Sequence, residues 1–163
     1  MSTQPEQRLS LRGLAAETGV SKSEVSLSIK RSLFSGLLRK QRTTGQLAVV
    51  TSALLEFSVH GLRYVFPAQP LSLVRGIATG VTAPVFQQQL YSAGEMIPVW
   101  ADAHGTSQGL EIKPLFPSVP FAVRQDRHLY AFLALLDSLR IGQVREQKIA
   151  AQRLTQQLEN TPD

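Results

Sequence analysis

The sequence predicts an α+β fold that is mainly helical, and three observations support this prediction. Residues 9–38 carry apolar side chains at the spacing of two short helices joined by a tight turn. Seven of the nine prolines fall between residues 67 and 120, which disfavours long regular elements there and leaves room for a short β-hairpin. The longest helical pattern starts near Arg124. We therefore expect three segments, at residues 1–66, 67–123 and 124–163.

The first helix is expected from the spacing of Leu11, Leu14 and Ala15, and the small Ala15 lets a second helix approach closely. Gly19 allows the chain to turn, and Val20 supplies an apolar side chain that fills the turn. Residues 9–38 therefore begin with a helix and a tight turn.

The second helix is expected to begin at Lys22, because Ser21 and Glu24 form an S-x-x-E capping pattern. In that pattern each side chain accepts a hydrogen bond from the other residue's backbone N–H. Apolar residues follow at helical spacing on the side that packs against the first helix: Val25, Ile29 and Leu33. The outer face then carries four side chains: Ser23, Leu27, Lys30 and Arg31.

The run L-A-x-x-x-G-V-S from Leu14 to Ser21, followed by Val25, resembles the helix-turn-helix of bacterial transcription regulators. In that family the start and outer face of the second helix contact bases in the major groove. The resemblance implies that residues 21–34 do so here, with six positions carried over: Ser21, Lys22, Ser23, Ser26, Leu27 and Lys30. Lysine can donate to guanine or phosphate, serine can pair with several groups, and leucine can touch a thymine methyl. The alternative is an ordinary helical corner with a solvated polar face.

The positive charge of the chain is concentrated near this pattern. The formal net charge is +5. Residues 1–45 hold eight Lys or Arg and three acids, residues 46–123 hold three and four, and residues 124–163 hold six and five. A basic N-terminal part is expected of a nucleic-acid-binding module, since neutralised phosphates supply most non-specific affinity. A simpler explanation is that the charge keeps the protein soluble.

Residues 39–46, RKQRTTGQ, add three cations and a turn signal after the second helix. We expect Arg39, Lys40 and Arg42, together with Arg31, to contact phosphates. The segment is either a loop on the DNA backbone or the tip of a wing, as in winged variants of the fold. Residues 47–60 have apolar side chains at helical spacing and predict a helix, which disfavours the wing.

The middle of the chain predicts short strands and loops. Residues 61–67, GLRYVFP, favour a strand, and residues 75–80, RGIATG, favour a turn-rich loop because they lack a complete phosphate-binding motif. Residues 97–102 and 110–115 favour the two strands of a hairpin with a long polar loop. Trp100 is expected to be a core or interface anchor rather than a platform for stacking bases.

No residue pattern indicates catalysis, a metal or a cofactor, and we expect a protein that is not an enzyme. Asp102 and His104 lie two residues apart, but two ligands are too few for a metal site. The chain has no cysteine, which fits a reducing cytoplasm. The polar start MSTQPEQR lacks the apolar core of a signal peptide, and no apolar run approaches the ~20 residues needed to span a bilayer.

Residues 124–163 are expected to form a long C-terminal helix that is interrupted at Gly142. Asp137 and Arg140 can pair at i,i+3. The first half of the helix carries an apolar stripe: Leu129, Phe132, Leu133, Leu136 and Leu139. This stripe either covers the protein's own core or holds two copies together, and we expect a homodimer whose contact includes residues 129–158.

These observations predict a cytoplasmic, sequence-specific regulator that binds double-stranded DNA, most simply a repressor acting as a homodimer. The C-terminal helix could also bind a protein partner. The alternative is a protein-interaction module, such as an antitoxin-like or assembly protein, whose helix-turn-helix binds protein rather than DNA. Lysine is depleted in the cores of protein interfaces, so the basic outer face favours DNA.

Overall fold

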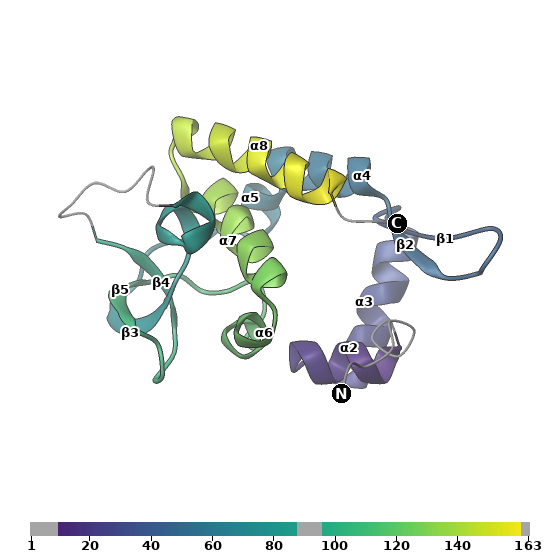
Figure 1. Ribbon diagram of the computed structural model, residues 1–163, viewed down its shortest axis with the longest axis horizontal. Helices are drawn as coiled ribbons and strands as arrows, with labels where there is room; N and C mark the ends of the chain where they lie inside the picture. The colour runs from purple at the N-terminus through teal and green to yellow at the C-terminus, as the bar shows by residue number, and fades with distance from the viewer. Residues whose placement is uncertain (1–9, 88–95, 161–163) are drawn as a thin grey trace. The chain divides into compact units, whose positions relative to one another are not determined.

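The computed structural model describes residues 10–87 and 96–160 (Figure 1). The fold is α+β and mainly helical, as predicted. The contacts divide the chain into two units, with the boundary between Leu54 and Leu55 rather than after residue 66. The polar start MSTQPEQR, residues 1–8, lies outside the described residues. None of the described helices combines the length and apolar character needed to cross a bilayer.

The first unit begins with α2 (Leu11–Thr18) and α3 (Lys22–Phe34), which cross near the start of α3 (Figure 1). Ser10 caps α2 by accepting a hydrogen bond from the Gly13 N–H at 3.0 Å. Gly19 ends α2 at φ 69°, a left-handed conformation that glycine adopts without strain. The predicted start of the second helix at Lys22 is therefore confirmed.

A two-stranded antiparallel hairpin follows α3, formed by β1 (Leu38–Lys40) and β2 (Leu47–Val49). The prediction that a helix starts at residue 47 is wrong for residues 47–49, because they form a strand that pairs with β1. At the tip, Gly45 has φ 70°, and the Gln41 N–H donates to the Gln46 carbonyl at 2.8 Å. This pairing across the tip outweighs the helical spacing of the apolar residues.

Residues 51–65 are continuously helical, as α4 (Thr51–Glu56), the π-helical turn η1 (Phe57–Gly61) and α5 (Leu62–Val65). The strand predicted for residues 61–67 is therefore wrong. Leu62 is 3% exposed and belongs to the main core of the second unit. Burial of this side chain decides the conformation over the strand preference of Tyr64, Val65 and Phe66.

Three short strands form a closed sheet in the second unit: β3 (Leu73–Ala78), β4 (Pro98–Ala101) and β5 (Ser107–Glu111). β3 is antiparallel to both β4 and β5, which are parallel to each other. Two predictions are thus wrong, since residues 75–80 are mostly strand rather than loop, and the two β-leaning runs do not form an antiparallel hairpin.

Glycine makes this closed arrangement possible. A Cβ on Gly76 would overlap the Trp100 carbonyl, one on Gly105 would overlap Gly76, and one on Gly109 would overlap the Ile97 carbonyl. The glycines that suggested a loop are needed where backbones approach closely.

The remaining elements are two 3₁₀ turns, η2 (Gly80–Thr82) and η3 (Pro84–Phe86), and three helices. The helices are α6 (Val119–Gln125), α7 (Arg127–Ile141) and α8 (Val144–Glu159). The single long C-terminal helix is corrected to α7 and α8. Gln143 starts α8 with a capping box, in which its backbone N–H donates to Glu146 Oε2 at 2.7 Å.

The apolar stripe predicted for dimer contact is partly inside the second unit. Leu136, Leu139 and Leu154 are buried in its main core, while Phe132 and Leu133 are half-buried and pack against that core. The stripe therefore covers the protein's own core, and it no longer supports a dimer contact.

A buried polar network joins α7 to the sheet. The Asp137 carboxylate accepts hydrogen bonds from Thr79 Oγ1 at 2.9 Å, Trp100 Nε1 at 2.7 Å and Arg140 Nη1 at 2.6 Å. Burial raises the pKa of Asp137, and Arg140 with the other donors acts in the opposite direction. The predicted pairing of Asp137 with Arg140 is confirmed, as is the core position of Trp100, which is 1% exposed.

Candidate nucleic-acid interface

The rotation of α3 is fixed by Val25, which is 7% exposed and the only residue of this helix to be fully buried. Ile29 and Leu33 lie on the same side and are half-buried. The opposite side of α3 must therefore face outward. This agrees with the apolar stripe predicted from the sequence.

The outward side presents most of the α3 residues that the sequence singled out. Ser21, Lys22, Ser23, Lys30 and Arg31 are exposed, Leu27 is 49% exposed, and Ser26 is half-buried. Sequence reasoning missed Phe34, which is 96% exposed. The spacing of the sequence could have identified Phe34, because it lies four residues after Lys30 and seven after Leu27, on the same helical face.

Arg31 is engaged by an acid of its own helix. Its Nη2 donates to Glu24 Oε1 at 2.5 Å and to Ser28 Oγ at 2.9 Å. The hydrogen bond from Arg31 lowers the pKa of Glu24. This corrects half of the predicted capping pattern: Ser21 Oγ accepts from the Glu24 N–H at 3.3 Å, but the Glu24 carboxylate turns to Arg31. The Glu24 carboxylate neutralises part of the charge that Arg31 could offer to a phosphate.

This ion pair gives a specific prediction. Glu24→Gln removes a negative charge from the face and frees Arg31, while the backbone N–H that Ser21 accepts from is unchanged. We expect tighter binding to duplex DNA at low salt and a log–log salt dependence steeper by roughly 0.9, the value for one added phosphate contact. Salt titrations by fluorescence anisotropy measure both, with Glu17→Gln as the control on α2. A weaker affinity for Glu24→Gln than for Glu17→Gln would contradict the prediction.

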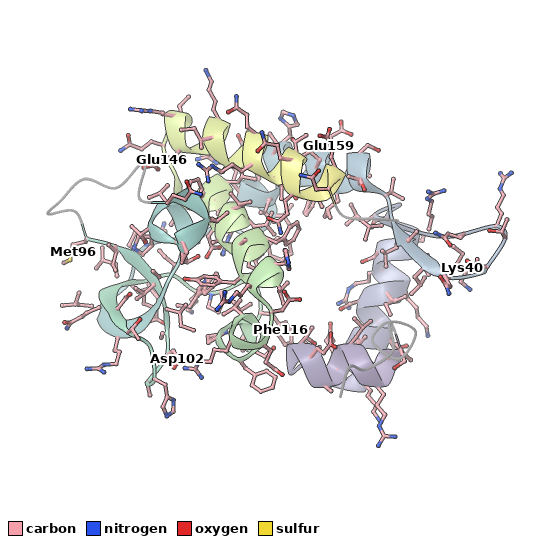
Figure 2. The ribbon with its side chains drawn as sticks, in the orientation of Figure 1. Lys40, Met96, Asp102, Phe116, Glu146 and Glu159 are labelled. Atoms are coloured by element: carbon pink, nitrogen blue, oxygen red, sulfur yellow. The ribbon has the colours of Figure 1, made fainter. Side chains whose placement is uncertain are left out.

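The hairpin supplies the remaining cations. Arg39 pairs across the sheet with Ala48, and Lys40 pairs with Leu47. Arg39, Lys40 and Arg42 are all exposed, and Lys40 is labelled on the hairpin in Figure 2. Arg42 lies in the tip between the strands, which Thr44 holds by donating to the Gln41 side chain at 2.7 Å. The unit thus carries cations on α3 and on the hairpin that follows it.

The described residues contain no group of three or more His, Cys, Asp or Glu side chains close enough to hold a metal ion. Asp102 and His104, which the sequence placed together, are 3.9 Å apart between Oδ1 and Nδ1. The Asp102 carboxylate pairs with Arg124 and accepts the His104 N–H at 2.7 Å.

Comparison with protein-family models, with curated proteins and with solved structures finds no match to this chain.

Proposed function

We propose that this protein is a DNA-binding transcriptional regulator whose first unit is a winged helix-turn-helix. One observation carries the proposal: the face of α3 opposite the buried Val25 is exposed and carries Ser23, Lys30 and Arg31 beside Leu27 and Phe34, and a hairpin with three exposed cations follows it. The resemblance of residues 14–25 to bacterial regulators points the same way. The regulator would act in the cytoplasm, most simply as a repressor.

In this proposal residues 21–34 enter the major groove. Lys30 donates to guanine or phosphate, Ser23 and Ser26 hydrogen-bond to base edges or phosphates, and Leu27 touches a thymine methyl group. These contacts would determine sequence preference. Lys22 at the start of α3 would hold the helix to the backbone.

The hairpin is the wing, and its role is to bind the DNA backbone rather than to recognise the base sequence. We expect the triple variant Arg39→Gln, Lys40→Gln, Arg42→Gln to bind all duplex sequences more weakly, with a salt dependence shallower by about 2.7, or 0.9 for each phosphate that is no longer neutralised. Fluorescence anisotropy at several salt concentrations measures the slope. The matched control replaces three exposed cations of the second unit with Gln: Arg127, Arg145 and Lys148. A wild-type affinity that does not change with salt would contradict the proposal.

The homodimer also remains part of the proposal, although the α7 stripe no longer supports it. A single helix-turn-helix buries little DNA surface, and two linked copies are the usual remedy. Two copies would read two half-sites about one helical turn apart. Mass measurement in solution, with and without DNA, tests this: a protein that stays monomeric at micromolar concentration in both samples contradicts it.

One observation favours the alternative, a protein-binding module. Phe34 and Leu27 lie on the same exposed face, and phenylalanine is enriched in protein interfaces. Phe34→Ser separates the two functions. DNA binding predicts that most of the affinity survives, because Lys30 and the hairpin cations remain, whereas a protein partner anchored by Phe34 would be lost.

A further inference from the structure

The second unit contains a cleft that the proposed DNA contacts do not use. Its volume is about 380 Å³. About half of its wall is apolar, with side chains from the sheet, η2 and the end of α7: Val81, Met96, Pro98, Leu110, Ile112 and Ile141. Figure 2 labels Met96 and Glu146, which both line it. A cleft of this size, with apolar side chains on one part of its wall and polar groups on another, is suited to a small amphipathic molecule.

Arg140 is a buried cation in the lining of this cleft, and only some of its N–H donors are used in hydrogen bonds. The Arg140 side chain is only 3% exposed and lines the cleft. Its Nε donates to the Phe66 carbonyl at 2.8 Å, and its Nη1 donates to the Lys113 carbonyl at 3.2 Å and to Asp137 Oδ1 at 2.6 Å. These bonds use three of the five N–H groups of the guanidinium.

The two N–H groups of Arg140 Nη2 make no hydrogen bond to any described residue. No completely buried side-chain nitrogen or oxygen among the described residues lacks a partner, so Nη2 is not completely buried. Arg140 lines the cleft, and Nη2 is the guanidinium nitrogen whose N–H groups are not used in bonds to described residues. A guanidinium held rigidly by three bonds is prepared to bind an oxyanion.

Other polar side chains also line the cleft, and two of them already make hydrogen bonds elsewhere. Glu146 Oε2 already accepts the Gln143 N–H at 2.7 Å, and the Ser138 hydroxyl donates to the Ala134 carbonyl at 3.1 Å. Arg63 is an exposed second cation in the lining. The lining thus holds two guanidinium groups and one carboxylate.

We propose that this cleft binds a small organic carboxylate, with the carboxylate on Nη2 of Arg140 and an apolar body against the wall. The buried Asp137 neutralises Arg140 and positions it, so that a ligand meets a fixed pair of donors rather than a free charge. The inference is independent of DNA binding, because every residue of the cleft lies in the second unit.

Three probes with the same six-carbon chain test the proposal: hexanoate, 1-hexanol and hexylamine, with benzoate as an aromatic acid. Isothermal titration calorimetry on the full chain gives the affinities. At least one acid should bind about tenfold or more tightly than 1-hexanol, the range for a hydrogen bond to a charged group, and hexylamine should bind least. The proposal is overturned if neither acid binds, or if the alcohol binds as tightly as both acids.

Variants assign the binding to Arg140. Arg140→Lys keeps a positive charge beside Asp137 but removes Nη2, and the preference for the acid over the alcohol should disappear. Arg145→Gln removes an exposed cation of α8 outside the cleft and should leave that preference intact. Val81→Phe places a larger side chain in the cleft and keeps Arg140, and it should weaken the binding of acid and alcohol alike about tenfold. If Arg140→Lys fails to fold, Val81→Phe still tests whether the ligand binds in this cleft. Acid binding that survives unchanged in Arg140→Lys or in Val81→Phe contradicts the proposal.

Discussion

Val25→Asp should unfold the first unit, whereas Leu27→Glu, two residues later, should leave it folded and abolish specific DNA binding. Val25 is 7% exposed, and a carboxylate placed there without a partner costs on the order of 3–5 kcal/mol, which a unit of this size does not survive. Leu27 is 49% exposed, so a charge there remains solvated. In the proposed complex, however, the new carboxylate would face the bases and phosphates of the groove.

The two units can be followed separately in this experiment. Trp100 is the only tryptophan of the chain and lies in the second unit, so its fluorescence reports on that unit alone. Val25→Asp should reduce the helical circular dichroism signal and leave the thermal transition of Trp100 unchanged. Leu27→Glu should change neither signal. If both variants lost the same helical signal, the orientation of α3 would be wrong.

Asp137→Asn should produce the largest loss of stability in the second unit. Arg140 is then left buried with no opposing charge, which costs about 3–5 kcal/mol, and this lowers the melting midpoint by roughly 15 °C or more. The ionised form of Asp137 is the one that fits the site, since three donors converge on its oxygens. Thermal melting followed by Trp100 fluorescence measures the effect directly, because Trp100 Nε1 donates to this carboxylate.

Asp102→Asn is the matched control. Asp102 also pairs with an arginine, and its own side chain is only 8% exposed, but the Arg124 side chain is 43% exposed, so water can solvate the cation that the substitution leaves unpaired. The amide oxygen of asparagine can still accept the His104 N–H. We expect a loss of about 1 kcal/mol or less. Equal losses for the two variants would show that burial does not decide the strength of the Asp137 pair.

The corner formed by α2 and α3 could be predicted from sequence because its determinants are local. Gly19 is needed for a left-handed residue, Ser21 caps the next helix, and the position of Val25 fixes which face is buried. Each of these acts within a few residues of the chain. The outward positions of Lys30, Leu27 and their neighbours followed from the same pattern.

The errors lie where contacts distant in sequence decide the conformation. Residues 47–49 carry helical spacing, but pairing with β1 makes them a strand. Tyr64 and Val65 prefer strands, but burial of Leu62 in the core keeps them helical. Gly76 suggested a loop, although its lack of a side chain is what lets β3 and β4 approach. Propensity is a weak guide in each case because the deciding partner is far away in the chain.

In the candidate site, too, the features set by neighbouring residues could be predicted, and those set by distant residues could not. Spacing alone placed the cations of residues 22–42 at the surface, but the bond between Arg31 and Glu24 depends on rotamers that spacing does not define. The cleft at Arg140 was not predictable, because its lining comes from segments between residues 63 and 146. Only the folded chain brings these segments together.

The central claim is that residues 21–34 read a DNA sequence, and sequencing the DNA that the protein retains tests it most directly. Genomic fragments are incubated with wild type and with Leu27→Glu, recovered with the protein and sequenced. The proposal predicts that wild type enriches fragments sharing one motif with two-fold symmetry, and that Leu27→Glu recovers fragments without it. Wild type that retains no common motif, or Leu27→Glu that enriches the same motif equally well, would contradict the claim.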